Sequence, residues 1–199
     1  MKHILIAGTA LFALSACGPT ASEVETAGDI TPEVAKKVEE MAETESPAEI
    51  GAAFLEENAK EFGVVTTDSG LQYKVAQEGL ENGAKPNLGQ PIAAHYHGYF
   101  IDGEVFDSSY ERRRPLTGRS NGFIAGWNES LGDMKVCEAR TLYINSDLAY
   151  GDDGRGGIPG GATLLFNMQL LAVDGKDEDG KIAYECPEDK VLSGPDDYK

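Results

Sequence analysis

Between residues 64 and 173 the chain carries a series of short β-prone segments with a single helical pattern among them. Branched and aromatic residues gather in these segments, and Gly, Asn, Asp and Pro separate them, as is typical of strands joined by turns. The segments cover 64–67, 70–75, 92–100, 105–106, 139–144 and 163–173, and the helical pattern covers 126–131. Many strands with one helix between them predict an α+β fold with an antiparallel sheet. We place this domain at residues 64–174, which is long enough for one hydrophobic core.

The charge of the chain excludes several classes of partner. Acidic residues outnumber basic ones 34 to 17 among 199 residues, for a net charge of −17. A nucleic-acid-binding protein needs a basic surface, and so does a protein that adsorbs to anionic lipid by charge. Three Cys and three His, widely scattered, are too few for a structural zinc site. We therefore expect no nucleic-acid partner, no metal and no cofactor.

Residues 1–16 have the pattern of a secretory signal peptide. Lys2 precedes an apolar run over 4–14, and Ser15 and Ala16 supply the small residues of a cleavage site. The apolar run is too short to span a membrane. The alternative is a buried N-terminal helix, which the charged start and the small-residue end disfavour.

The next residue resembles the acylation site of bacterial lipoproteins. Leu14-Ser15-Ala16-Cys17 is similar to a lipobox, and by that resemblance Cys17 carries the lipid that anchors the mature chain. The alternative is a chance cysteine after an ordinary signal peptide. Gly18 is not the Asp that retains lipoproteins in the inner membrane of enteric bacteria, so the outer membrane is favoured. The expected location is the cell envelope, on its periplasmic side.

Residues 17–63 are expected to form a tether and short helices. Residues 18–31 are small and polar, without periodicity. Pro32 suits a helix start, and Ser46-Pro47 can cap a second helix that Gly63 ends. We expect these helices to pack on the main domain or on another copy of the chain. A solvated acidic spacer is the alternative.

Cys137 and Cys186 remain once Cys17 is assigned to the lipid. In an exported protein they can form a disulfide between the domain and the acidic tail at 175–199, or remain two unpaired thiols. The sequence alone does not give the distance between them.

No motif of nucleophilic or metal catalysis occurs in the sequence. His95 and His97 point to one face of a strand, where core or surface histidines are the favoured interpretation. Aromatic residues gather near strand ends instead. They can form an ordinary core or a dry pocket with few polar groups. They are Tyr96, Phe106, Phe123, Trp127, Tyr150 and Phe166.

An ordered set of motifs decides between these two interpretations of the aromatic residues. In order they are Ala94-His95-Tyr96-His97-Gly98, Gly103 with Phe106-Asp107-Ser108-Ser109, Ile124-Ala125-Gly126-Trp127, Ala149-Tyr150-Gly151, Ile158-Pro159 and Ala162-Thr163-Leu164-Leu165-Phe166. The set closely resembles the FK506-binding protein (FKBP) family of peptidyl-prolyl cis/trans isomerases. Residues 54–58 and 67–75 are similar to the exported bacterial branch, which includes the macrophage infectivity potentiator type.

The resemblance implies a bent antiparallel sheet wrapped around one short helix, with the active pocket between them. It implies Trp127 as the pocket floor that receives the proline ring, and the Tyr150 hydroxyl and Ile124 amide as groups that hold substrate carbonyls. Asp107 lies at the pocket edge, paired with Arg112 or Tyr96, and Ile158 lies on the loop above. The apolar walls are Tyr96, Phe106, Phe123, Ile124 and Phe166.

The resemblance also implies the activity and its partners. The expected function is rotation of X-Pro bonds in unfolded or exported polypeptides, with binding of FK506- or rapamycin-type macrolides. The chain departs from the family pattern in several places. Gly118 stands where an aromatic residue usually lines the rim, Leu148 replaces a common Tyr, and the loop at 152–157 is one residue short. Pro159-Gly160-Gly161 stands where a second Pro is usual, and Asn167 replaces an acidic residue. These departures leave a catalytically weak chaperone or binding module as the alternative.

Overall fold

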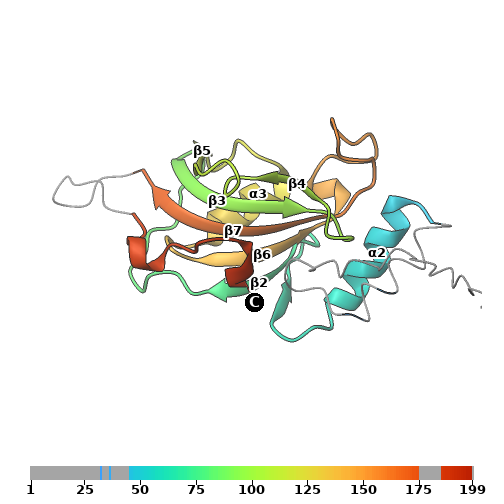
Figure 1. Ribbon diagram of the computed structural model, residues 1–199, viewed down its shortest axis with the longest axis horizontal. Coiled ribbons are helices and arrows are strands. Elements are labelled where there is room, and N and C mark those ends of the chain that lie inside the picture. Colours follow the sequence, from blue (N-terminus) through green and yellow to red (C-terminus); the bar gives the residue numbers. More distant parts are fainter. Residues whose placement is uncertain (1–31, 33–35, 37–44, 175–184, 199) are drawn as a thin grey trace, which may run out of the picture.

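The computed structural model describes residue 32, residue 36 and residues 45–174 and 185–198. The predicted signal peptide and Cys17 lie outside the described residues. Figure 1 shows a curved sheet with one short helix against its inner face and a second helix beside one end. Within the described ranges 45–174 and 185–198 the helices are α2 (Pro47–Asn58) and α3 (Ala125–Asp133), with 3₁₀ turns at Ser146–Leu148, Glu188–Lys190 and Pro195–Tyr198. Among the described residues, neither helix has the length and apolar character needed to cross a bilayer.

The sheet has seven strands, and every pair in it is antiparallel. The strands are β1 (Val64–Thr66), β2 (Gln72–Gln77), β3 (Pro91–Tyr99), β4 (Val105–Ser108), β5 (Leu116–Arg119), β6 (Ala139–Ile144) and β7 (Leu164–Val173). Their order is β1-β2-β6-β7-β3-β4, and β5 also pairs with β3. The predicted α+β fold is confirmed. Strand β5 was not predicted, because its four residues, LTGR, include a glycine and lack an apolar alternation.

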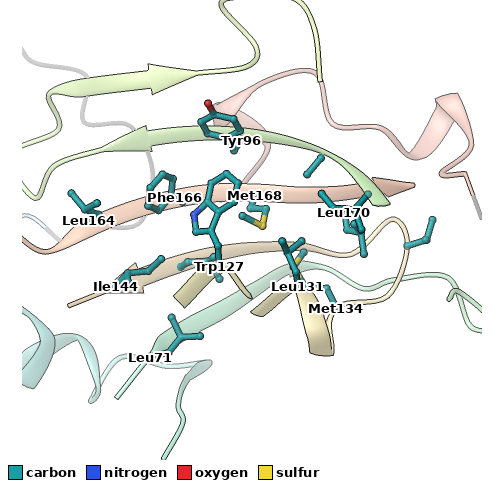
Figure 2. Packing of buried hydrophobic residues seen from close by; sticks show 14 of the residues in the cluster. Leu71, Tyr96, Trp127, Leu131, Met134, Ile144, Leu164, Phe166, Met168 and Leu170 are labelled. Carbon is teal, nitrogen blue, oxygen red and sulfur yellow. The ribbon is translucent and has the colours of Figure 1, made fainter. Parts of the chain in front are cut away.

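Helix α3 packs directly on the inner face of the sheet. Gly126 makes this possible, since a Cβ at that position would lie 2.7 Å from the Ile144 side chain on β6. Figure 2 shows Trp127 and Leu131 directed from α3 toward the side chains of β7 and β3. Trp127, Leu131, Leu142, Phe166 and Met168 are all at most 4% exposed. The helix and the inner face thus form one core, as the family resemblance implied.

Helix α2 closes one end of the outer face. Ser46 and Glu49 form a capping box, and Pro47 occupies the first turn, as the Ser-Pro pattern predicted. Phe54 is 3% exposed and packs against Tyr143, with the ring centroids 6.0 Å apart. This helix therefore contacts the main domain, which was one of the two packing arrangements expected.

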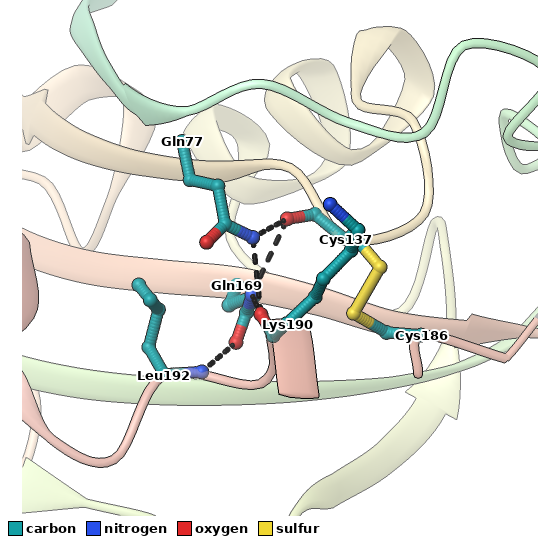
Figure 3. Close-up of a disulfide and its surroundings, with 6 residues drawn as sticks. All are labelled: Gln77, Cys137, Gln169, Cys186, Lys190 and Leu192. Carbon is teal, nitrogen blue, oxygen red and sulfur yellow. Dashed lines mark hydrogen bonds between the residues drawn. A yellow bond between two sulfur atoms is a disulfide. The ribbon is translucent and has the colours of Figure 1, made fainter. Parts of the chain in front are cut away.

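Residues 185–198 of the predicted acidic tail cross the rest of the outer face (Figure 1). Residues 185–198, called here the strap, lie across β7 and β6 (Figure 1). A disulfide joins Cys137 to Cys186, with the Cα atoms 5.0 Å apart (Figure 3). The fully buried Gln169 donates to the Lys190 carbonyl at 2.8 Å and accepts from the Leu192 amide at 2.8 Å. Backbone groups of the strap thus satisfy polar side chains of the sheet, which would otherwise be costly to bury.

His97 lies on the same outer face and is 6% exposed. Its Nδ1 has no hydrogen-bond partner among the described residues. Loss of solvation lowers the pKa of His97, while the nearby carboxylates of Glu111 and Asp196 act in the opposite direction.

Stability is therefore expected to fall in mild acid. The folded pKa of His97 lies below the unfolded value near 6.5, so the unfolded chain binds the extra proton first. The stabilising contribution is present above about pH 6.5 and is lost as the pH falls toward the lowered pKa. Urea unfolding at pH 7 and pH 5 should give a smaller difference for His97→Gln than for the native chain. Equal differences would contradict this assignment.

Candidate active site

A pocket of about 750 Å³ opens between α3 and the inner face of the sheet. Nine of the ten pocket residues expected from the sequence line it; the tenth, Arg112, lies behind its edge. The lining residues are Tyr96, Phe106, Asp107, Leu116, Gly122, Phe123, Ile124, Ala125, Trp127, Ala149, Tyr150, Arg155, Gly157, Ile158 and Phe166. Some of them come from the strands β3, β4, β5 and β7 and from helix α3. The others come from the loop before α3 and from the loop before β7.

Trp127 occupies the floor of this pocket. The indole is 4% exposed, and the rings of Tyr96 and Phe166 meet it edge-on at centroid distances of 4.9 and 5.1 Å. Phe123 adds a third ring at 5.3 Å. The indole Nε1 is buried and has no hydrogen-bond partner among the described residues. The result is a floor of packed aromatic rings, which forms where α3 meets the sheet.

The polar groups are held at one edge by a three-residue network. The Tyr96 hydroxyl donates to Asp107, and the Arg112 guanidinium donates to Asp107 and, at 2.6 Å, to the Tyr96 oxygen. The Arg112 guanidinium also lies 5.4 Å from the centre of the Tyr96 ring. Burial and the Asp107 carboxylate raise the pKa of Tyr96 to about 12. The hydrogen bond to Tyr96 raises the pKa of Arg112 further. Asp107 is therefore paired with both candidates, and the raised pKa keeps the Tyr96 hydroxyl protonated at neutral pH.

Asn128 fixes the backbone at the entrance to α3. Its side-chain oxygen accepts from the Phe123 amide at 3.0 Å, and its side-chain nitrogen donates to the Phe123 carbonyl at 3.0 Å. Ile124 follows as the N-cap residue, and its amide has no hydrogen-bond partner among the described residues. Sequence reasoning missed Asn128, although an amide side chain in the first turn of a helix is a typical backbone clamp.

Tyr150 and Ile158 form the opposite side. Asn145 caps the 3₁₀ turn by accepting from the Leu148 amide at 3.0 Å, and the chain then turns so that Tyr150 faces the pocket. In the part of the chain that the structure describes, no group bonds to the Tyr150 hydroxyl. Ile158 is held by paired backbone hydrogen bonds of 3.0 Å to Arg155. The Tyr150 hydroxyl and the Ile124 amide are thus free to receive a ligand.

Phe123 explains the glycine at position 118. A Cβ at Gly118 would lie 2.6 Å from the Phe123 ring. Phe123 thus fills the space beside β5 that a side chain at 118 would take. The family pattern shows that the usual aromatic side chain is missing at position 118. It does not show that the ring of Phe123 takes its place.

Gly118→Ala is expected to displace the Phe123 ring and to lower the unfolding free energy by about 1–3 kcal/mol. Ligands of the pocket should bind more weakly as well. Urea unfolding and a ligand titration measure the two effects. Gly132→Ala is the matched control, because no atom lies within 4 Å of its Cβ position and alanine favours helix. Equal effects of the two substitutions would contradict the role given to Phe123.

Known proteins share both the sequence pattern and the fold. Residues 82–171 match the family model for FKBP-type peptidyl-prolyl cis-trans isomerase, and residues 13–75 match the domain found amino-terminal to it. The FKBP-type isomerase FkpA of Aeromonas hydrophila is 42% identical over 130 residues, which cover 65% of this chain. The crystal structure of FkpA from Escherichia coli has 37% identity and a TM-score of 0.60, covering 71% of this chain and 62% of that one.

A smaller solved structure matches over nearly its whole length. The crystal structure of AtFKBP13 has 38% identity and a TM-score of 0.50, and 95% of that protein is covered by 54% of this chain. The chain belongs to the FKBP-type peptidyl-prolyl cis-trans isomerase family. It spans 48% of the Aeromonas FkpA, so this FKBP chain corresponds to about half of that relative.

Proposed function

We propose that this FKBP chain is a peptidyl-prolyl cis/trans isomerase that rotates X-Pro bonds in polypeptides. The observation that carries the proposal is the pocket floored by Trp127 and surrounded by aromatic rings, with the charged Asp107 at its edge. A proline ring is apolar and compact, and such a pocket can hold it without a nucleophile, metal or cofactor.

The reaction needs only a change of environment around one amide. The barrier to rotation is about 20 kcal/mol, because resonance gives the C–N bond partial double-bond character. Near the halfway twist the resonance is lost, and so is the strong solvation of the planar amide. A dry pocket disfavours the planar, solvated amide relative to the twisted one, and this difference lowers the barrier.

The residues around the pocket have different roles in the proposed isomerisation. Trp127, Phe106 and Phe166 hold the proline ring. The Tyr150 hydroxyl and the Ile124 amide donate to substrate carbonyls on either side of the rotating bond. Asp107, fixed by Arg112 and Tyr96, presents its carboxylate near the twisting amide.

The place of action follows from the start of the sequence. The signal-peptide pattern of residues 1–16 and the lipobox-like sequence before Cys17 support a lipid-anchored location in the cell envelope, on the periplasmic side and with the outer membrane favoured. Newly exported polypeptides with proline are then the substrates. Their X-Pro bonds isomerise in tens of seconds unaided, which is slow enough to limit folding. Macrolides of the FK506 and rapamycin type would occupy the same pocket.

Refolding of a model protein whose slow phase is limited by proline tests this proposal. The chain should accelerate the slow phase at substoichiometric concentration, and a macrolide should abolish the acceleration. If the slow phase is unchanged while macrolide still quenches Trp127 fluorescence, the pocket serves a binding module or chaperone, and the enzyme proposal fails.

A further inference from the structure

Arg155 is the one basic side chain among the residues that line the pocket. It is exposed at the mouth, on the loop between Tyr150 and β7. No ion pair joins it to a carboxylate in the described part of the chain. An unpaired guanidinium at the mouth of an apolar pocket is available to a ligand.

The backbone holds Arg155 in place. Arg155 and Ile158 exchange hydrogen bonds of 3.0 Å in both directions, and they close a two-residue turn. Gly156 has φ of +61°, a conformation that glycine adopts without strain. Gly156 and Gly157 link the pair, as in a two-residue hairpin turn. The backbone of Arg155 is therefore paired with that of Ile158, one of the residues proposed to face the substrate.

Two charged residues line the pocket, and Arg155 is the one without a partner of opposite charge in the described part of the chain. Asp107 is the acidic member of the lining, and Arg112 pairs with it from behind. Asp152 and Asp153 lie on the same loop and are exposed, but they do not line the pocket. A side chain that enters beside the proline ring thus meets a positive charge, on a chain whose net charge is −17.

We propose that Arg155 sets a substrate preference, favouring polypeptides with an acidic residue directly before the proline. This inference rests on the proposed isomerase function. Consecutive Cα atoms are about 3.8 Å apart, so the residue joined to a proline on the pocket floor lies among the residues that line the pocket, which include Arg155. Its carboxylate can pair with the guanidinium there. Exposed ion pairs are weak, so the preference should be about two- to fivefold.

The test compares Ala-Glu-Pro-Phe and Ala-Gln-Pro-Phe peptides, which differ in charge and not in shape. The expected ratio of kcat/KM (Glu over Gln) is about two- to fivefold for the native chain. It should fall to about one for Arg155→Gln and below one for Arg155→Glu, and it should shrink with added salt. Arg114→Gln is the control, because it removes the same charge from an exposed position outside the lining, and it should keep the native ratio.

The two proposals fail in different ways. Acceleration of the Gln peptide with a ratio of one in the native chain overturns the role of Arg155 and leaves the isomerase intact. If neither peptide is accelerated, the isomerase proposal fails, and the ratio of dissociation constants from Trp127 fluorescence then tests Arg155 instead. An Arg155→Gln variant with the native ratio, in rate or in binding, also overturns the inference.

Discussion

Asp107→Ala is expected to lower kcat/KM for X-Pro isomerisation by about 10- to 100-fold, since small displacements of positioned groups cost this much. The substitution removes the acceptor of both Tyr96 and Arg112 at the pocket edge. The Tyr96 hydroxyl is then free to turn toward the apolar floor, and the guanidinium loses its fixed place. Spectrophotometric isomerisation of a chromogenic tetrapeptide measures the loss.

Asp107→Asn separates charge from shape. The amide keeps the volume and an acceptor for the Tyr96 hydroxyl but loses the attraction to Arg112. An intermediate rate is expected, and urea unfolding should show that both variants remain folded. If Asp107→Ala isomerises the peptide at the native rate, the network is structural and has no part in the reaction.

Removing the disulfide has the largest expected effect on stability. Cys137 and Cys186 are 49 residues apart, so the cross-link greatly restricts the unfolded chain. Loss of such a bond costs about 2–4 kcal/mol. The double variant Cys137→Ala, Cys186→Ala should lose this much unfolding free energy. Trypsin should also cleave it sooner after Lys190, because the strap is then held by hydrogen bonds alone.

The pocket should be insensitive to this change. The strap covers the outer face of the sheet, and the pocket lies on the inner face, so kcat/KM is expected to stay within about twofold, the size of a surface effect. The native chain treated with a reductant is a second route to the same state. If the double variant has the same unfolding free energy as the native chain, then the hydrogen bonds of the strap, and not the disulfide, hold the strap in place.

The strand pattern and the inner core were predictable, because they depend on local properties. Alternating residues fix the faces of β3 and β7, and the order of motifs along the chain identifies the family. The helix over 126–131 was predicted two residues short at its C-terminal end, where helix boundaries are weakly encoded.

The outer face was not predictable to the same degree. Asn167 and Gln169 alternate with apolar residues along β7 and look like solvent-facing positions, yet both are fully buried. They are buried because the strap returns from a distant part of the chain and supplies backbone partners. Phe123 in the space beside Gly118 is a second case. Both depend on how side chains pack in three dimensions, which composition and periodicity do not contain.

The central claim is that the pocket rotates the X-Pro bond. The direct measurement is cis-to-trans isomerisation of an Ala-Leu-Pro-Phe peptide followed with and without the native chain, beside Tyr150→Phe and Asp107→Ala. We expect a rate that rises linearly with the concentration of the chain, is lower in both variants and returns to the uncatalysed value with macrolide. An uncatalysed rate at all concentrations, while macrolide still binds, would contradict it.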